Sequence, residues 1–205
     1  MMANLFPMFV KLAGRKCLVV GGGPVAEGKI EGLLSCQATV VLVAPEVTEK
    51  IARWNDEGRL TWQARQFQPS DLEGVFLVVA ATGVDTVNEQ VFREAEARGI
   101  LCNAVDEPER CHFYYPAIVR RGPLQIAIST GGLSPALASR LRAELEAQFG
   151  PEYERWLQKL GAMRRALFAR RIDPRRRTRV LQLLASRKSY ERFLRLESRR
   201  TGGSA

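Results

Sequence analysis

The chain has 205 residues, of which 46% are apolar and 26% charged. This excludes a peptide, a disulfide-stapled miniprotein and a disordered or collagen-like chain, and it leaves about one or two compact domains. No apolar run reaches the roughly 18 residues that cross a bilayer, and residues 1–11 lack the pattern of a secretory signal, so we expect a cytoplasmic protein. The net charge of +9 is uneven: residues 1–119 hold eleven Lys and Arg against fifteen Asp and Glu, net −4, whereas residues 120–205 hold twenty against seven, net +13.

The first part of the chain alternates between strand and helix patterns. Short, continuously apolar runs rich in β-branched residues are typical of parallel strands buried on both faces, and they occur at Lys16–Val20, Thr39–Val43 and Val75–Ala81. Helix-length segments separate or follow them at Pro24–Ser35 and Val84–Arg98, and a further strand is expected at Ile100–Asn103. Strands that alternate with helices predict a doubly wound parallel sheet.

A glycine-rich turn follows the first predicted strand. Gly21-Gly22-Gly23-Pro24-Val25-Ala26 matches the G-x-G-x-x-A pattern and opens the first helix. Gly21 permits the tight turn, Gly23 lets the backbone approach a pyrophosphate, and Ala26 allows the helix to pack closely on the strand. The helix N-terminus supplies unpaired N–H groups for phosphates. We therefore predict a dinucleotide site here; the alternative is a purely structural glycine turn.

Two further segments should reach the same site. The acid that holds the adenosine ribose usually ends the second strand, where this chain has Val43-Ala44-Pro45-Glu46. Either Glu46 or the backbone of Ala44 and Pro45 would take that role, and no arginine follows directly to meet a 2′-phosphate, which favours NAD over NADP. Thr82 and Gly83 lie at the carboxyl end of the third strand and should line the cofactor crevice.

Asp106 follows the last predicted strand of this part, on a loop at the same edge of the sheet. A carboxylate there could exchange protons with a bound substrate, although an Asp before Glu-Pro also suits a simple turn. His112 is the only histidine, so we predict no metal site; it is a surface or core residue or, less favoured, a second proton carrier. The cysteines show neither metal-site spacing nor disulfide density, and we expect reduced, mostly buried thiols at Cys17, Cys36, Cys102 and Cys111.

The second part of the chain is mainly helical and basic. A strand pattern at Leu124–Ser129 leads through Thr130-Gly131-Gly132-Leu133 to a helix with Ser134 as N-cap and Pro135 at its first position. Arginine-rich helices are expected to about Phe149, over Pro151–Ala169 and from Pro174 to about Arg199, before a flexible tail at 201–205. The charge of +13 indicates an anionic partner, with a solvated helical surface as the alternative.

Six segments, in order, resemble the siroheme synthase family, in particular its precorrin-2 dehydrogenase and sirohydrochlorin ferrochelatase module. They are Phe6-Pro7-Met8-Phe9, Val20–Ala26, Val43-Ala44-Pro45, Ala80-Ala81-Thr82, Asn103-Ala104-Val105-Asp106 and Ser129–Pro135. The resemblance covers residues 5 to about 150 and continues more loosely into the helical region. It implies NAD-dependent dehydrogenation of precorrin-2 to sirohydrochlorin and, in bifunctional members, insertion of ferrous iron, a substrate, to give siroheme.

The resemblance also implies site residues and an assembly. The NAD contacts of the family fall on Gly23, Pro24, Val25, Pro45 and Glu46, its key acid falls on Asp106, and its members form homodimers through the segment after the nucleotide domain. Precorrin-2 is an octacarboxylate, which suits the basic second part. Because the chain ends at residue 205, we expect it to lack the uroporphyrinogen methyltransferase domain fused to some relatives.

We therefore predict a Rossmann-like α/β domain over residues 1–116, a dimerisation segment of strand and helix over 117–149, and a helical domain with a flexible tail over 150–205. The candidate cofactor residues are Gly21, Gly23, Pro24, Val25, Pro45, Glu46 and Thr82, and the candidate catalytic residue is Asp106. The two-step enzyme and a dehydrogenase with a separate chelatase both remain open. A non-enzymatic NAD-sensing or nucleic-acid-binding module is less favoured, because the chain has no helix-turn-helix, stacking ladder or zinc-finger pattern. Which arginines meet substrate is also open; Arg120, Arg121, Arg140 and Arg142 are candidates.

Overall fold

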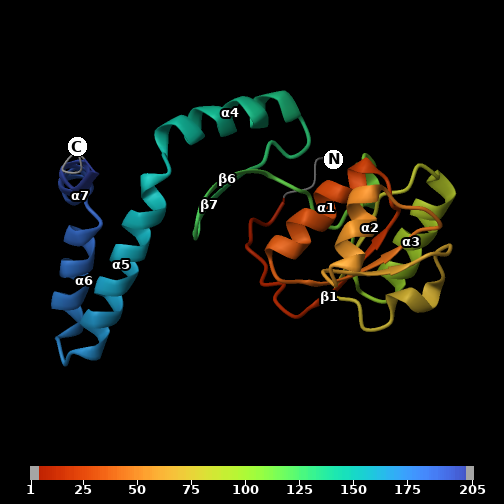
Figure 1. Cartoon of the computed structure of the whole chain (residues 1–205), viewed down its shortest axis with the longest axis horizontal. Coiled ribbons are helices and arrows are strands. Elements are labelled where there is room, and N and C mark those ends of the chain that lie inside the picture. Colours follow the sequence, from red (N-terminus) through yellow and green to blue (C-terminus); the bar gives the residue numbers. More distant parts are fainter. Residues whose placement is uncertain (1–4, 202–205) are drawn as a thin grey trace. The chain divides into compact units, whose positions relative to one another are not determined.

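The structure is a computed structural model that describes residues 5–201. The described residues form two compact units, which divide between Tyr115 and Pro116 (Figure 1). Within residues 5–201 no helix is both long enough and apolar enough to span a membrane.

The first unit is built on a five-stranded parallel sheet with the strand order β3-β2-β1-β4-β5. The strands are β1 (Lys16–Val20), β2 (Thr39–Val43), β3 (Thr61–Gln63), β4 (Leu77–Ala80) and β5 (Leu101–Ala104). The chain adds strands outward from β1 on one side and then returns to add β4 and β5 on the other. This order confirms the predicted Rossmann-like fold and puts the switch point between β1 and β4, where such sheets bind ligands.

Helices cover both faces of this sheet. α1 (Pro24–Ser35) and α2 (Glu49–Asp56) pack on one face, and α3 (Asp85–Ala97) and the short helix η1 (Pro69–Leu72) pack on the other (Figure 1). Along β1, Cys17 and Val19 point into the first layer, while Leu18 and Val20 point into the second. Burial on both faces explains why the central strands are continuously apolar instead of alternating.

The strands and helices at the centre of the first unit match the sequence prediction residue for residue: β1, α1 and β2 have the expected bounds. The predicted strand Val75–Ala81 is shorter, at Leu77–Ala80, because Leu72 and Val75 belong to the turn that follows η1. α2 and β3 were not predicted. A second short helix, η2 (Pro108–Arg110), follows β5.

The second unit begins with an antiparallel hairpin and continues as helices. Its elements are β6 (Ala117–Arg121), β7 (Leu124–Ile128), α4 (Pro135–Gln148), α5 (Glu152–Ala169), α6 (Pro174–Leu184) and α7 (Arg187–Thr201). β7 agrees with the predicted strand, but its partner β6 was not predicted. The prediction of a single helix from Pro174 to about Arg199 is wrong, because α6 ends at Leu184 and α7 begins at Arg187. Between them, Ser186 Oγ accepts a hydrogen bond from the Ser189 N–H in the first turn of α7.

Side-chain caps and an aromatic cluster stabilise the second unit. Ser134 Oγ accepts a hydrogen bond from the Leu137 N–H at 3.2 Å, with Pro135 as the first helical residue, as predicted. Trp156 of α5 and Phe193 of α7 are buried against each other, and Tyr190 donates to Glu152 Oε1 at 2.6 Å. Of the flexible tail predicted over 201–205, Thr201 ends α7, and residues 202–205 lie outside the described residues.

Candidate functional site

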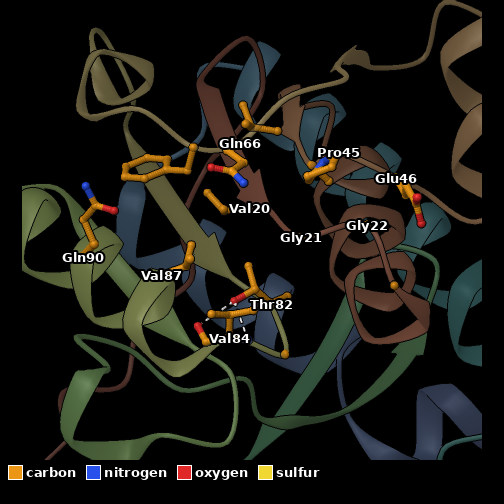
Figure 2. A pocket seen from close by; sticks show the side chains of 16 residues that line it. Val20, Gly21, Gly22, Pro45, Glu46, Gln66, Thr82, Val84, Val87 and Gln90 are labelled. Atoms are coloured by element: carbon orange, nitrogen blue, oxygen red, sulfur yellow. Dashed lines mark hydrogen bonds between the residues drawn. The ribbon is translucent and has the colours of Figure 1, made fainter.

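A cavity of about 540 Å³ opens at the carboxyl edge of the parallel sheet, over the switch point between β1 and β4 (Figure 2). It is within the usual size range of cofactor sites. Its walls come from the loops after β1, β2, β3 and β4 and from the first turns of α3. The predicted residues Gly21, Gly23, Pro45, Glu46 and Thr82 all line it.

The glycine turn at the base of the cavity is fixed by close backbone packing. Gly21 has a φ of 111°, and a Cβ there would lie 2.3 Å from the carbonyl oxygen of Ala81. A Cβ on Gly22 would lie 2.2 Å from the carbonyl oxygen of Glu46. Only glycine fits at either position, so the turn holds the loops after β1, β2 and β4 against one another.

Gly23 differs from the two glycines before it. Its φ of −82° is ordinary, and a Cβ there would meet no atom of the chain within 4 Å. The residue is the N-cap of α1 but has no side chain to satisfy the first N–H groups of the helix. The space over Gly23 is therefore open and faces unpaired N–H donors, which is what a pyrophosphate requires. Pro24 and Val25 form the first turn of α1 and are exposed, but they are not part of the cavity wall.

The opposite wall of the cavity is held by side chains that the sequence did not single out. Trp62 of β3 donates from Nε1 to the carbonyl oxygen of Ala44 at 2.9 Å, which fixes the backbone before Pro45 and Glu46. Gln66 and Phe67, on the loop after β3, also line the cavity. Figure 2 shows Pro45 and Glu46 on one side of the glycine turn and Thr82 on the other.

An ion pair between a half-buried arginine and a buried aspartate holds this loop after β3. Arg65 donates to both carboxylate oxygens of Asp71, at 2.9 Å and 2.5 Å, and the Gln68 N–H donates to the same carboxylate at 2.8 Å. Burial alone would raise the pKa of Asp71, but these hydrogen bonds and the charge of Arg65 outweigh it and hold the pKa below its usual value.

The loops after β4 and β5 are joined by one buried amide. The Thr82 hydroxyl donates to Asn88 Oδ1 at 2.7 Å, and Asn88 Nδ2 donates to Glu107 Oε1 at 2.9 Å. Glu107 in turn pairs with Arg110, which also contacts Asp85 at 2.6 Å. Thr82, at the cofactor cavity, and Glu107, which follows Asp106 in the chain, are therefore parts of one hydrogen-bonded network.

Asp106 is exposed on the loop after β5 and has a φ of 63°. Asp is one of the few residues that adopt this left-handed conformation readily. The Glu107 N–H donates to the Ala104 carbonyl at 3.2 Å and closes the turn around it. Asp106 is not part of the cavity wall. It lies on the loop after β5, the strand next to β4, and the loop after β4 does line the cavity.

The histidine and the cysteines near this loop have structural contacts. His112 Nδ1 accepts the backbone N–H of Cys102 at 3.0 Å, and its ring lies 5.2 Å from that of Phe92. Burial raises the pKa of the Cys17 thiol to about 11 and that of Cys102 to about 12, so both are protonated near neutrality. All four cysteines are free thiols; Cys17 and Cys102 are buried, and Cys36 and Cys111 are half-buried. Residues 5–201 contain no group of three His, Cys, Asp or Glu side chains arranged to hold a metal ion.

Three of the four candidate arginines have side-chain partners in the second unit. Arg121 donates to the carbonyl oxygens of Phe149 and Glu146 and so binds the end of α4. Arg140 and Arg142 pair with acidic residues one helical turn away. Arg120 is exposed.

The cavity fits a nicotinamide dinucleotide. Its glycine turn, its open helix N-terminus at Gly23 and the carboxylate of Glu46 have the arrangement in which Rossmann domains hold pyrophosphate and ribose. The sequence missed Gln66, Phe67, Val84, Val87 and Gln90, which also line the cavity. Val84, Val87 and Gln90 could have been found from the helical spacing that follows Thr82, whereas Gln66 and Phe67 depend on the unpredicted strand β3.

Comparisons with known proteins agree with this geometry. Residues 8–117 match the family described as putative NAD(P)-binding, and residues 121–148 match the central region of sirohaem biosynthesis proteins. The chain is 39% identical to siroheme synthase of Nitrosococcus oceani over 92% of its own length and 38% of that protein. It is 46% identical to siroheme synthase of Methylobacillus flagellatus over 73% of its own length and 32% of that protein.

The chain thus spans about a third of the length of these two relatives. A solved structure titled "SirC, precorrin-2 dehydrogenase" is similar over 90% of this chain and 91% of that one, with a TM-score of 0.78 and 30% identity. The first family match covers most of the first unit and the second covers α4 with the start of the second unit, and the resemblance noted in the sequence is confirmed. The chain belongs to the siroheme synthase family, whose putative NAD(P)-binding domain it carries over residues 8–117.

Proposed function

We propose that this chain is an NAD-dependent dehydrogenase that oxidises precorrin-2 to sirohydrochlorin in siroheme biosynthesis. The observation that carries the proposal is the cavity over the switch point of the sheet, with the open N-terminus of α1 at its base and a carboxylate on the adjacent loop. The similarity to a precorrin-2 dehydrogenase over nine-tenths of both chains supports the choice of reaction.

Each part of the cavity has a role in this proposal. The backbone N–H groups of Gly23 and Val25, with the dipole of α1, bind the pyrophosphate. Gly21 shapes the turn, because its own N–H donates to the Val43 carbonyl, and Pro24 has no N–H and serves to start the helix. Pro45 and Glu46 hold the adenosine ribose, and the negative charge of Glu46 disfavours the 2′-phosphate of NADP. Thr82 positions the cofactor from the β4 side. Bound NAD would accept the hydride that leaves the substrate.

Asp106 is the proposed proton acceptor. Dehydrogenation removes a hydride and a proton together, and the proton needs a base at the substrate. Asp106 is an exposed carboxylate on the loop beside the cavity, and the Asn88–Glu107 contact ties that loop to Thr82. The base and the cofactor site are thereby linked within one unit.

Insertion of ferrous iron is a second proposed step, supported by the siroheme synthases that match the chain. Iron would be a substrate held by the tetrapyrrole nitrogens, and Asp106 would take protons from the pyrrole N–H groups. The alternative is a dehydrogenase alone, with a separate chelatase.

We also propose a homodimer formed through residues 117–149. A two-stranded hairpin is marginally stable by itself, and β6 and β7 are mostly only half-buried, with Val119 the one buried residue between them. Leu133, before α4, is 70% exposed. A second copy would cover these surfaces. Light scattering of the purified chain would detect the dimer as twice the monomer mass.

The net charge of +13 over residues 120–205 would attract the substrate carboxylates.

The test is to supply precorrin-2 with NAD, follow NADH formation, and then add ferrous iron while recording the tetrapyrrole spectrum. We expect NADH in proportion to sirohydrochlorin, followed by the siroheme spectrum. No NADH above the uncatalysed rate would contradict the dehydrogenase. Sirohydrochlorin that stays unmetallated beyond the uncatalysed rate would leave the dehydrogenase alone.

A further inference from the structure

Lys29 of α1 lies against an aromatic ring from another part of the first unit. Its Nζ atom is 3.9 Å from the centre of the Tyr115 ring, a close cation–π contact. Lys29 is half-buried, whereas 40% of the surface of Tyr115 is exposed. The amine is therefore withdrawn from bulk water but lies beside a ring that a ligand can reach.

Lys29 lacks the acidic partners that a withdrawn ammonium normally has. Within the described part of the chain it forms no ion pair and no hydrogen bond. Lys50 of α2 gives a direct comparison, because its amine also lies over a ring, 4.9 Å from that of Trp54, but is paired with Glu27 at 3.6 Å and Glu31 at 3.5 Å. Of two lysines in similar aromatic contacts, one is neutralised and the other is not.

The electrostatic neighbours of Lys29 belong to the candidate site. Burial lowers the pKa of the Lys29 amine, and the negative charges of Asp106 and Cys111 partly restore it. Burial also raises the pKa of the Cys111 thiol, which is therefore uncharged near neutrality, and Asp106 remains as the charged neighbour. The ammonium of Lys29 and the carboxylate proposed as the base thus act on each other without forming an ion pair.

We propose that Lys29 is a substrate-binding residue that takes one carboxylate of the polycarboxylate tetrapyrrole and so places the macrocycle beside Asp106. The inference rests on the proposed function, because it takes its ligand from the proposed substrate. An ammonium has three N–H donors and none is used within the described residues, so a carboxylate would give it charge-assisted hydrogen bonds and the missing counter-ion. The ligand is an anion that this chain does not itself supply.

Two variants and one control separate the role of the charge from that of the side chain's bulk. Lys29→Met keeps the length and the packing on Tyr115 but removes the charge, and Lys29→Arg keeps the charge. Lys50→Met removes the lysine whose charge is already balanced by Glu27 and Glu31 of α1. Loss of one charge-assisted hydrogen bond corresponds to about a tenfold loss of affinity.

Binding is measured first with uroporphyrin, a stable planar octacarboxylate, by quenching of its fluorescence. We expect Lys29→Met to raise the Kd about tenfold and both Lys29→Arg and Lys50→Met to stay within about threefold of the wild type. The Kd for NAD and the Tm should not change in any of them. Equal uroporphyrin affinity of Lys29→Met and the wild type would overturn the proposal. A loss of uroporphyrin affinity that is accompanied by a similar loss of NAD affinity and a lower Tm would also overturn it, because it would indicate a general loss of structure.

Turnover of precorrin-2 then separates this inference from the proposed function. We expect Lys29→Met to raise the KM about tenfold and to leave kcat within about twofold. If the wild-type chain binds uroporphyrin in a Lys29-dependent way but forms no NADH from precorrin-2, the anion site stands and the proposed oxidation fails. If NADH forms and the KM of Lys29→Met is that of the wild type, the proposed oxidation stands and the role of Lys29 fails.

Discussion

Asp106 occupies a backbone position that few residues tolerate. Its φ of 63° follows directly from the turn closed by the Glu107 N–H, and a short side chain that tolerates the left-handed region fits there. The neighbouring Glu107 is anchored to the buried Asn88. A flexible surface carboxylate would sample many positions, whereas this one starts from a fixed backbone.

Asp106→Asn keeps the shape of this side chain and removes its ability to accept a proton. If Asp106 is the base, turnover should fall by about a hundredfold or more, because positioned general bases contribute that much. The Kd for NAD should stay at the wild-type value, since Asp106 does not line the cavity. Steady-state NADH formation and a cofactor titration check both, and unchanged turnover would remove Asp106 from the reaction.

The glycines of the turn give a matched pair of substitutions. A methyl group on Gly23 meets no atom of the chain, so Gly23→Ala should cost at most about 1 kcal/mol, through the weaker N-cap, yet should weaken NAD binding at least about tenfold. A methyl group on Gly21 would collide with Ala81, so Gly21→Ala should lower the stability itself by about 2–4 kcal/mol. Denaturant unfolding and NAD titration of both variants distinguish the two effects. NAD binding of Gly23→Ala at wild-type strength would place the pyrophosphate elsewhere.

The predictable part of the site consists of residues that directly follow predicted strands. Gly21, Gly23 and Glu46 follow predicted strands directly, and the parallel sheet brings their loops to one edge. The lysine contact was not predictable, because Lys29 and Tyr115 are far apart in the chain and meet only after the segment that follows β5 folds back beside α1. Gly22 was also missed: the pattern leaves that position free, and only its contact with the Glu46 carbonyl requires glycine.

At the scale of elements, the loop after β3 depends on the Arg65–Asp71 ion pair. Asp71 is buried, with a side chain only 6% exposed, and it joins Arg65 to the backbone of Gln68 beside the cavity residues Gln66 and Phe67. Phe67 and Leu72 of the same segment pack in the second core layer, so the ion pair and this apolar packing together should set the shape of this wall.

Asp71→Asn should destabilise the first unit by about 2 kcal/mol at neutral pH. The folded-state pKa of Asp71 lies below its unfolded value of about 3.9, so its ionised form stabilises the fold above that pH, and the contribution is lost as the pH falls through the folded pKa. The stability difference between variant and wild type, measured by urea unfolding, should therefore shrink in acid. A difference that stays constant down to pH values where Asp71 is protonated would assign it to packing instead of charge.

Three elements with strong local signals were predicted with correct bounds, and elements with weak signals were missed. β1 and β2 are apolar runs bounded by turn residues, and α1 starts at Pro24. β3 has only three residues at the edge of the sheet, and β6 ends in two arginines, so neither carries a buried-strand pattern. Their positions are set by strand partners and not by their own composition.

At the scale of the whole molecule, the two parts of the chain differ in charge. The cofactor cavity lies in the part with net charge −4, and the part from residue 120 onward carries +13. If the second part attracts the substrate, the KM for precorrin-2 should rise about threefold or more between low and physiological salt, whereas the Kd for NAD should change less. Kinetics and cofactor titration over a salt series test this. Equal salt dependence of the two would leave the basic helices as a solvated surface.

The proposed reaction depends most on NAD binding in the cavity over the switch point. Calorimetric titration of the purified chain with NAD and with NADP measures this directly. We predict saturable heat with one NAD per chain, at least about tenfold weaker NADP, and a Tm that rises with NAD concentration. No heat and no thermal protection with either cofactor would contradict the central claim.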